Sequence, residues 1–311
     1  MKRVVSIILS LVCVAICVIG VIFLKPSDAQ TQKEGYSGIL RLWHIDLFEG
    51  GKGSRSAFLN RVAGRYEKQN ENLYIMVNTY TAQGAAEAFA KGEYPDLLSF
   101  SCGVDGVAEV CRKLSFHFGG GEIGQNTYAY PWCGGGYYLF CLEEDFSSVS
   151  AETLVLSDGG NNLPWIAAAL YGVKGEITCE SSTSAYVHFL NGKYRYMLGT
   201  QRDICRFQAR GVNVYSQPLP KYNDLLQYIA VTAREGNSVT ACEEFINFLL
   251  SNEEQQKLSE IGMYSVSQIS AQNTLSAFVT QGALGELCAV SQSALKTGDI
   301  KILKSYLKAL N

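Results

Sequence analysis

The sequence predicts an α/β fold with a mainly parallel sheet, and three observations support this prediction. An apolar run at residues 40–45 predicts a buried strand, and a glycine-rich loop at residues 49–53 follows it. Apolar residues then recur at helical spacing over residues 58–66. A β-rich segment at residues 73–80 and an alanine-rich one at residues 83–91 continue the alternation. Strands that alternate with helices imply right-handed crossovers between parallel strands.

The loop after the first strand is the first candidate for a binding rim. Ser54 or Ser56 can cap the following helix by accepting hydrogen bonds from its free backbone N–H groups. In open α/β sheets, ligands bind at the carboxyl ends of strands, where loops and helix N-termini meet. The loop from Asp46 to Arg55 is therefore expected to face a ligand.

Composition and charge narrow the class of protein. With 311 residues and 47% hydrophobic content, the chain can bury a large core in one large domain or two smaller ones. The net charge is -3 and no basic run occurs, which argues against nucleic acid as a partner and against a polybasic membrane patch.

The N-terminus, residues 1–29, predicts a membrane anchor or a signal segment. Lys2 and Arg3 precede an apolar run at residues 4–24, which is long enough to cross a bilayer as a helix. A cleaved secretory signal is the alternative, because residues 27–29 are small or polar as a cleavage site requires. In both cases the body of the protein is expected outside the cytoplasm, at the outer face of the cell membrane.

A polar stretch at residues 30–38 predicts a tether, and the folded domain is expected to span residues 39–311. Its further elements follow from the same periodicities. Strands are predicted at 94–100, 194–198, 212–217 and 225–232, and helices at 104–114, 163–170, 184–190, 283–295 and 299–310. Another helix is predicted to begin at residue 240, and the capping box at 251–254 starts the next one, which Gly262 closes.

An aromatic-rich stretch at residues 128–142 contains three successive glycines, Gly134 to Gly136. Glycine within strand-like sequence indicates close approach of another backbone or of a ligand, and the stretch predicts a crossing between two lobes. An ordinary aromatic hairpin is the alternative. The hinge strands are expected near residues 99–102, 129–132 and 215–218.

Motifs for catalysis are scarce. No G-x-S-x-G elbow, H-E-x-x-H pair or complete Walker loop occurs, and His44, His117 and His188 are too scattered to predict a metal site. No catalytic residue, metal or cofactor is therefore predicted. An envelope enzyme would need an acid/base pair, and the sequence offers none. Ten cysteines occur, and the eight that remain beside Cys13 and Cys17 allow 105 pairings, so their pairing stays open.

Side chains suited to recognition are more evident. Aromatic faces can stack on sugar rings or other small amphipathic ligands, and a few polar groups set the orientation. For the tryptophans, packing in the core is the alternative, and for the polar residues it is a solvated loop. The candidate ligand-binding residues are Trp43, Glu49, Lys52, Ser101, Trp132, Gln201 and Arg202.

Gln201 and Arg202 follow the strand predicted at 194–198 and a turn at 199–200, so both should project from a carboxyl end. Arg202 presents a rigid donor fork, and Gln201 offers both a donor and an acceptor. Surface pairing of Arg202 with Asp203 or Glu180 is the alternative.

Five segments in order resemble the extracellular solute-binding proteins of the family-1 type, which serve ABC importers for sugars and related solutes. These segments are residues 40–55, 92–101, 129–146, 189–203 and 241–267. The resemblance implies a periplasmic-binding-protein-like clamp of two lobes that closes on a ligand in the cleft between them. It places lobe 1 at about 39–102 plus the C-terminal helices, and lobe 2 at about 130–215. Residues 146–184 are few for this family, so lobe 2 is expected to be shortened.

The leading functional prediction is an extracytoplasmic solute-binding subunit. It would deliver a small solute, a sugar or oligosaccharide, to the permease of an ABC transporter. The alternative is a ligand-sensing ectodomain that works with a membrane signalling protein.

Overall fold

The computed structural model describes residues 36–46, 52–115, 121–160, 162–233, 236–269 and 274–310. Residues 37–311 form one compact unit. The predicted anchor at 4–24, most of the tether and Glu49 lie outside the described residues, so those predictions stay untested. Within the described ranges, no helix combines the length and the apolar character that a membrane crossing needs.

The first lobe is built on a five-stranded sheet with the order β2-β1-β3-β12-β6. Strand β1 (Gly38–Ile45) pairs in parallel with both β2 (Leu73–Tyr80) and β3 (Leu97–Phe100), as the alternation of elements predicts. The returning strand β12 (Leu226–Val231) is antiparallel to β3 and to β6 (Tyr130–Gly134). Segments from both halves of the chain therefore complete this sheet.

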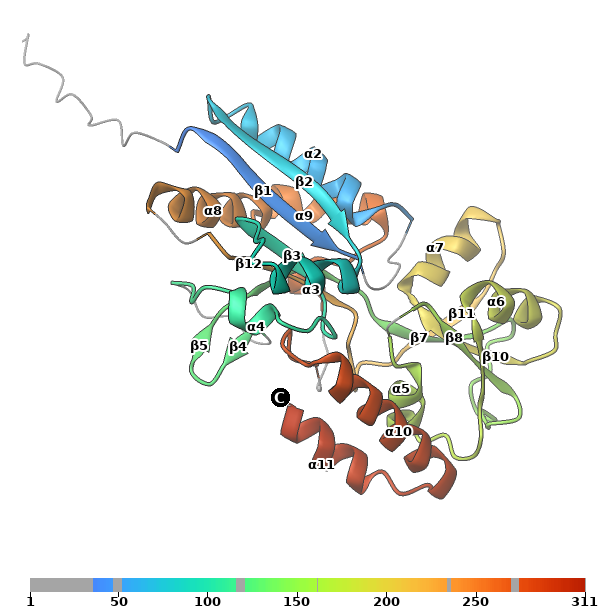
Figure 1. Ribbon diagram of the computed structural model, residues 1–311. Coiled ribbons are helices and arrows are strands. Elements are labelled where there is room, and N and C mark those ends of the chain that lie inside the picture. Colours follow the sequence, from blue (N-terminus) through green and yellow to red (C-terminus); the bar gives the residue numbers. More distant parts are fainter. Residues whose placement is uncertain are drawn as a thin grey trace, which may run out of the picture. The chain divides into compact units, whose positions relative to one another are not determined.

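Helices cover both faces of this first sheet (Figure 1). Helix α2 (Arg55–Glu67) packs with α8 (Gly236–Leu249) on one face, and Ser54 caps α2 by accepting a hydrogen bond from Ala57 N at 3.2 Å. Helix α3 (Ala82–Ala90) covers the other face, where its alanines and Phe89 join a core that includes Trp43. The lobe is completed by α4 (Val107–Val110), β4 (Glu122–Ile123), β5 (Asn126–Thr127), α9 (Asn252–Gln256) and two 3-10 turns, η1 (Lys257–Ile261) and η2 (Val266–Gln268).

The second lobe has its own five-stranded sheet, with the order β11-β7-β10-β8-β9. Strands β10, β8 and β9 are parallel, whereas β7 and β11 run antiparallel to their neighbours. Its separate core centres on Phe140, Phe189 and Phe207. The strands are β7 (Tyr137–Cys141), β8 (Leu154–Asp158), β9 (Thr178–Ser181), β10 (Tyr196–Thr200) and β11 (Tyr215–Pro218), and the helices are α5 (Pro164–Tyr171), α6 (Ser182–Leu190) and α7 (Gln201–Ala209). The two-lobe α/β fold predicted from the sequence is confirmed.

The lobe crossings differ in part from the predicted hinge strands. The chain passes from β6 into β7 through residues 135–136 and returns from β11 to β12 through residues 219–225. The predicted hinges at 129–132 and 215–218 thus lie just before the true crossings. The third, at 99–102, is wrong, because the chain continues from β3 into α4, β4 and β5 of the same lobe.

The C-terminal helices correct the predicted lobe assignment. Helices α8 and α9 pack in the first lobe as expected, but α10 (Gln281–Thr297), followed by α11 (Lys301–Leu310), packs against α5 of the second lobe. The reason lies in α5, whose residues from Ile166 to Leu170 are all buried, so that this helix needs cover on two sides. The first turn of α10 still contacts the first lobe, where Gln281 N donates to Asp105 Oδ1 at 3.1 Å.

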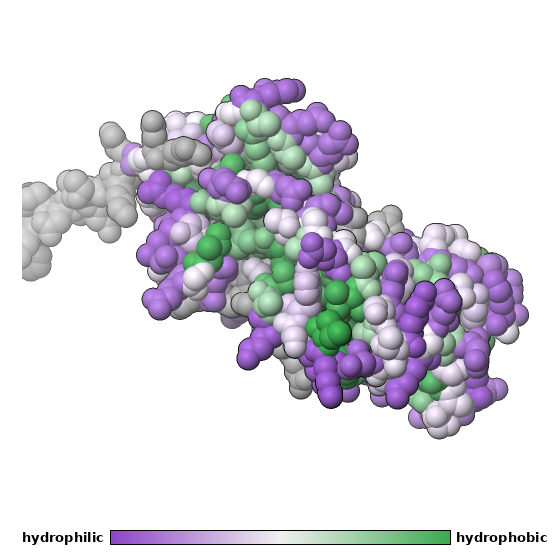
Figure 2. Space-filling view, turned by 60° about the horizontal axis from the view of Figure 1, so that its bottom comes forward, coloured by the Kyte–Doolittle hydropathy of each residue, from purple (hydrophilic) through white to green (hydrophobic). Residues whose placement is uncertain are grey.

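Figure 2 shows hydrophilic residues spread over one face of the molecule, with hydrophobic residues in small groups between them. This distribution agrees with a sequence of small net charge whose charged residues are dispersed.

Candidate functional site

Polar side chains gather where the parallel strands of the second lobe end. Strands β8 and β10 and the start of α6 bring them around a small cavity of about 10 Å³, enough for one water molecule. Because parallel strands end at one edge of a sheet, residues distant in sequence meet there. The lining residues are Ser157, Gly159, Asn162, Ser182, Thr200, Arg202, Asp203 and Leu225.

The turn predicted at 199–200 is wrong, because these residues end β10. Gln201 and Arg202 follow the carboxyl end of this strand as predicted, but they begin helix α7 there. Thr200 ends β10 and forms a capping box with Asp203, whose Oδ2 accepts a hydrogen bond from Thr200 N at 3.0 Å. The spacing Thr-x-x-Asp before the buried Phe207 is the signal that would have identified this helix.

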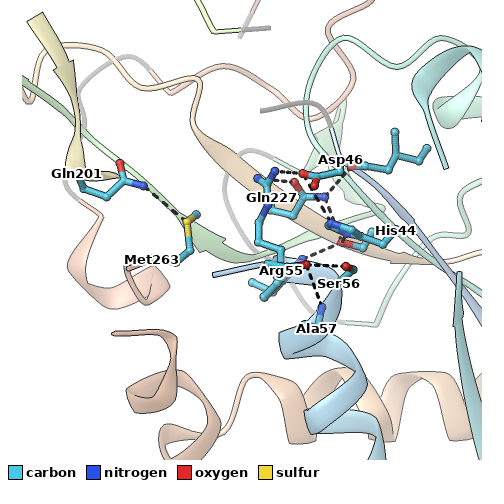
Figure 3. Close-up of polar contacts among 12 residues, drawn as sticks. His44, Asp46, Arg55, Ser56, Ala57, Gln201, Gln227 and Met263 are labelled. Atoms are coloured by element: carbon cyan, nitrogen blue, oxygen red, sulfur yellow. Dashed lines mark hydrogen bonds and ion pairs between the residues drawn. The ribbon is translucent and has the colours of Figure 1, made fainter. Parts of the chain in front are cut away.

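Gln201 is fixed at the crossing between the lobes. Its side chain is 2% exposed, its Oε1 accepts from Gly136 N at 3.0 Å, and its Nε2 lies 3.6 Å from Met263 Sδ (Figure 3). A Cβ added to Gly135 would stand 2.3 Å from Gln201 Oε1. A close approach therefore occurs at the three-glycine run as predicted, but at Gly135 the approaching group is a glutamine side chain and not the backbone or ligand that was expected.

Arg202 projects at the polar edge and its Nη1 donates to Ser182 Oγ at 3.2 Å. Next to it, Asp203 is 2% exposed, and burial raises the pKa of this carboxyl. Asp203 Oδ1 accepts no hydrogen bond and lies 3.4 Å from Arg206 Nη1. The edge thus offers a cationic fork and hydroxyl groups, beside a buried Asp203 carboxylate that pairs with Arg206.

In the first lobe, a buried hydrogen-bond network supports the end of β1 (Figure 3). Arg55 is 2% exposed; it donates to Asp46 and, through Nη1, to Gln227 Oε1 at 3.2 Å. The side chain of Asp46 remains 42% exposed, and Asp46 directly follows β1. Arg55 therefore holds a partly exposed carboxylate in place at a carboxyl end of the sheet.

His44 completes this network in its neutral form. Burial and the neighbouring Arg55 charge lower its pKa to about 4. Ser99 Oγ accepts from Trp132 Nε1 at 3.0 Å and from Gln227 Nε2 at 3.2 Å, so its own hydroxyl donates to His44 Nδ1 at 3.0 Å. The imidazole proton then sits on Nε2, which points toward Asp46 Oδ1 at 3.9 Å.

Two of the tryptophans proposed for ligand contact lie in the core. Trp43 is 4% exposed and stacks on Tyr80, and Trp132 is fully buried and stacks on Phe58. Packing is the role that the structure gives both rings, because each faces a covering helix of the first lobe. Ser101 directly follows β3 and is also buried, at 2% exposure.

Lys52 is exposed, and its backbone N–H donates to Ile261 O at 2.8 Å. Its charge acts on Cys205 of α7. Burial raises the pKa of the Cys205 thiol, and the positive charge of Lys52 opposes this shift. Lys52 of the first lobe therefore lies within electrostatic range of α7, the helix of the second lobe that begins with Gln201 and Arg202.

Asp224 is the main polar residue that the sequence did not reveal. It lies on the second crossing with 4% exposure, and it accepts from Tyr137 Oη and from Leu163 N, both at 2.7 Å. Burial raises its pKa to about 6. Because both donors belong to the second lobe, Asp224 ties the crossing to that lobe. An isolated aspartate before an apolar strand gave no signal of this role.

A larger cavity of about 230 Å³ lies beside the crossings and is lined mainly by tyrosine and proline side chains. Tyr138 of the second lobe and Tyr264 of the first meet there, with their hydroxyl oxygens 2.9 Å apart. These rings supply aromatic surface where the two lobes meet.

The described residues contain no group of three histidine, cysteine or acidic side chains that could hold a metal ion. The eight cysteines in the same part of the chain are free; five are buried and three are partly exposed.

No protein-family model matches the sequence, and no curated protein matches it either. Solved structures do match in fold. The sugar-binding protein MalE from Xanthomonas citri superposes with a TM-score of 0.61 at 13% identity, covering 88% of this chain and 96% of that one. The galacto-N-biose-/lacto-N-biose I-binding protein of the ABC transporter from Bifidobacterium longum gives 0.58 at 11%, covering 89% and 96%.

A protein described as mediating signal transduction in a two-component system matches with a TM-score of 0.50 at 14% identity, covering 74% of this chain and 87% of that one. At these identities the likeness concerns the fold. The chain has the two-lobe α/β architecture of these binding proteins.

Proposed function

We propose that the chain is an extracytoplasmic solute-binding subunit that takes a sugar or oligosaccharide between its lobes and delivers it to an ABC importer. The observation that supports this most is the polar edge at Arg202, Ser182 and Asp203. A sugar hydroxyl can donate and accept at once, so a cationic donor next to an acceptor oxygen suits it. The solved structures of similar fold include sugar-binding proteins.

The ligand-binding residues proposed are Lys52 and Ser101 on the first lobe and Gln201 and Arg202 on the second. Asp46 extends this set, since its exposed carboxylate stands at the end of β1. The tyrosines of the 230 Å³ cavity add aromatic faces against which a pyranose ring can pack. Residues 1–29 are proposed to hold the protein at the outer face of the cell membrane.

Binding is tested by calorimetric titration of the full chain in lipid nanodiscs with maltose, maltotriose, lactose and their monosaccharides. Arg202→Ala should weaken binding about 10-fold to 100-fold, because a charge-assisted hydrogen bond contributes about 1.5–3 kcal/mol. The matched control is Arg210→Ala, since Arg210 is an exposed arginine that caps the same helix. It should change the dissociation constant less than about threefold.

Absence of binding by every sugar would refute the proposed ligand class, and equal affinities of wild type and Arg202→Ala would remove Arg202 from the site. Delivery to an importer is tested by uptake of the bound sugar in cells with and without the protein. Unchanged uptake would refute the transport role.

A ligand-sensing ectodomain is the second candidate, because the two-component signalling protein shares the fold over 74% of this chain. In that case the sugar would bind with the same dependence on Arg202. Deletion of the protein would then abolish a transcriptional response to the sugar and leave its uptake unchanged.

A further inference from the structure

A further cavity lies in the first lobe, away from the polar edge of the second lobe. It is an open hollow of about 590 Å³, within the range of about 300–1,000 Å³ typical of small-molecule sites. It lies on the face of the sheet that α3 covers, and extends from the start of β3 and the loop after α3 to Tyr80, the last residue of β2. Its lining residues are Arg41, Trp43, Asn78, Tyr80, Gly92, Glu93, Tyr94, Pro95, Asp96, Thr232 and Ala233.

Strand geometry explains why this face of the sheet is open. Side chains alternate between faces, and the parallel register pairs Arg41 with Met76 and Trp43 with Asn78 on the same face. Helix α3 covers the part of this face around Trp43. Beyond it, Tyr74 and Met76 remain 63% and 46% exposed. The hollow thus continues onto an uncovered strip of sheet.

The aromatic walls of the hollow are held rigid by stacking. Tyr80 stacks on Trp43 with ring centroids 4.2 Å apart, Trp43 on Phe89 at 6.0 Å, and Phe89 on Tyr94 at 6.2 Å. The two tyrosines at the ends of this stack are partly exposed. Because their neighbours fix them, little side-chain entropy would be lost when a ligand packs on them.

The polar lining favours a neutral ligand that is rich in hydroxyl groups. Arg41 has its side chain 51% exposed, with Nε 3.7 Å from Asp96 Oδ2, and Asn78 adds an amide. Glu93 and Asp96 would repel an anion, and Arg41 would repel a cation. Donors and acceptors next to an aromatic face match a pyranose, whose hydroxyls do both and whose C–H face packs on rings.

We propose that this hollow is a second saccharide site, which takes a pyranose unit against Tyr80 and Tyr94 with Arg41, Asn78 and Asp96 as hydrogen-bonding partners. It is independent of the site between the lobes. The hollow would hold a second part of a glycan, or a second sugar, whether the site between the lobes is occupied or empty.

The test is photolabelling of the full chain in lipid nanodiscs with diazirine-bearing methyl glucoside, methyl galactoside and methyl mannoside, each at about 10 mM, above a millimolar dissociation constant. Mass spectrometry of the digest should locate label of at least one sugar in residues 73–96. Excess unlabelled glycoside should suppress it, and the diazirine tag without sugar should give none.

Asn78→Trp fills the hollow and should reduce this labelling about tenfold. Thr79→Trp is the matched control, because Thr79 is exposed on the same strand but points to the opposite face, and it should label as wild type does. If Asn78→Trp fails to fold, Glu93→Arg takes its place as the test variant. This change lies in an exposed loop that lines the hollow, and it should alter the labelling of residues 73–96.

Absence of label in residues 73–96 with all three sugars would overturn the proposal, and so would equal labelling of Asn78→Trp and Thr79→Trp. Labelling by the tag alone would show that the hollow takes the tag and not the sugar, and would also overturn the proposal. Labelling by a diazirine phospholipid in the same nanodisc without competition by sugar would assign the hollow to lipid instead. Arg202→Ala should leave the labelling of residues 73–96 unchanged. Loss of this labelling in Arg202→Ala would place the sugar between the lobes.

Discussion

The buried carboxyl of Asp224 should make the stability of the protein depend on pH in an unusual direction. Asp224 is 4% exposed, and its pKa is raised by burial from 3.8 to about 6, although hydrogen bonds from Tyr137 and Leu163 N oppose the shift. The folded protein therefore holds a proton at Asp224 over a range of pH in which the unfolded chain has released it.

The sign follows from proton linkage. Between about pH 4 and pH 6 the folded state binds more protons at Asp224 than the unfolded state does, so the free energy of unfolding falls as the pH rises. The stabilisation from the proton on Asp224 is fully present below the pKa that Asp224 has in the unfolded chain, and it is lost as the pH rises through the pKa in the folded protein. A difference between 3.8 and about 6 corresponds to about 3 kcal/mol at full titration.

Asp224→Asn removes the titration and keeps one acceptor oxygen for the donors. The difference in unfolding free energy, variant minus wild type, should therefore rise by up to about 3 kcal/mol between pH 4 and pH 7. Urea unfolding of the full chain in detergent micelles, followed by tryptophan fluorescence at several pH values, measures this difference.

The control is Asp145→Asn, because hydrogen bonds from Ser147 lower the pKa of this exposed carboxyl. The stabilising effect of the Asp145 carboxylate is present above its pKa in the unfolded chain and is lost as the pH falls. The difference in unfolding free energy between Asp145→Asn and wild type should therefore change with pH in the opposite direction to that of Asp224→Asn. A flat or falling difference for Asp224→Asn would refute the assignment of a raised pKa.

Three further outcomes are expected. Trp132→Phe keeps the ring stack but removes the hydrogen bond to Ser99, so the free energy of unfolding measured in urea should fall by about 1–3 kcal/mol. The affinity for ligand should stay within threefold of wild type. A large loss of affinity in a variant of unchanged stability would contradict the packing role. Gly135→Ala forces its Cβ against Gln201 and should cost about 1–3 kcal/mol, and an unchanged urea midpoint would show that the contact is not tight. NMR should show that the His44 imidazole stays neutral down to about pH 4. The native state should therefore lose stability as the pH falls below 6.5, the pKa of histidine in the unfolded chain. Titration of His44 near pH 6.5 would contradict the buried network.

The order of elements in the first hundred residues was predictable from the sequence because it depends on local periodicity. The strand–loop–helix start, the parallel pairing of β1 with β2 and β3, and the amphipathic α2 follow from patterns within a dozen residues. Helix α7 was missed altogether because its first turn is polar, and only the pairing of Thr200 with Asp203 marks its start. Polar first turns resemble loops when their spacing is not examined.

The assignment of the tryptophans shows a different limit. Alternation predicts which face of a strand Trp43 or Trp132 occupies, but not whether a helix covers that face. In the structure α3 covers Trp43 and α2 covers Trp132, so both became core residues. The predicted lobe of α10 failed for the same reason, because its partner α5 lies more than a hundred residues earlier.

The sequence by itself determined the fold class, the alternation of strands and helices from β1 to β3 and the glycine run where the lobes join, since each is written in the spacing of neighbouring residues. It did not reveal β8 and β9 of the second sheet. Only the tertiary structure decided that Gln201 fills the space above Gly135, that Asp224 is buried against Tyr137, and that Arg202 meets Ser182. Burial and hydrogen bonding between such segments arise when distant parts of the chain exclude water from one another, and no local pattern records which parts will meet.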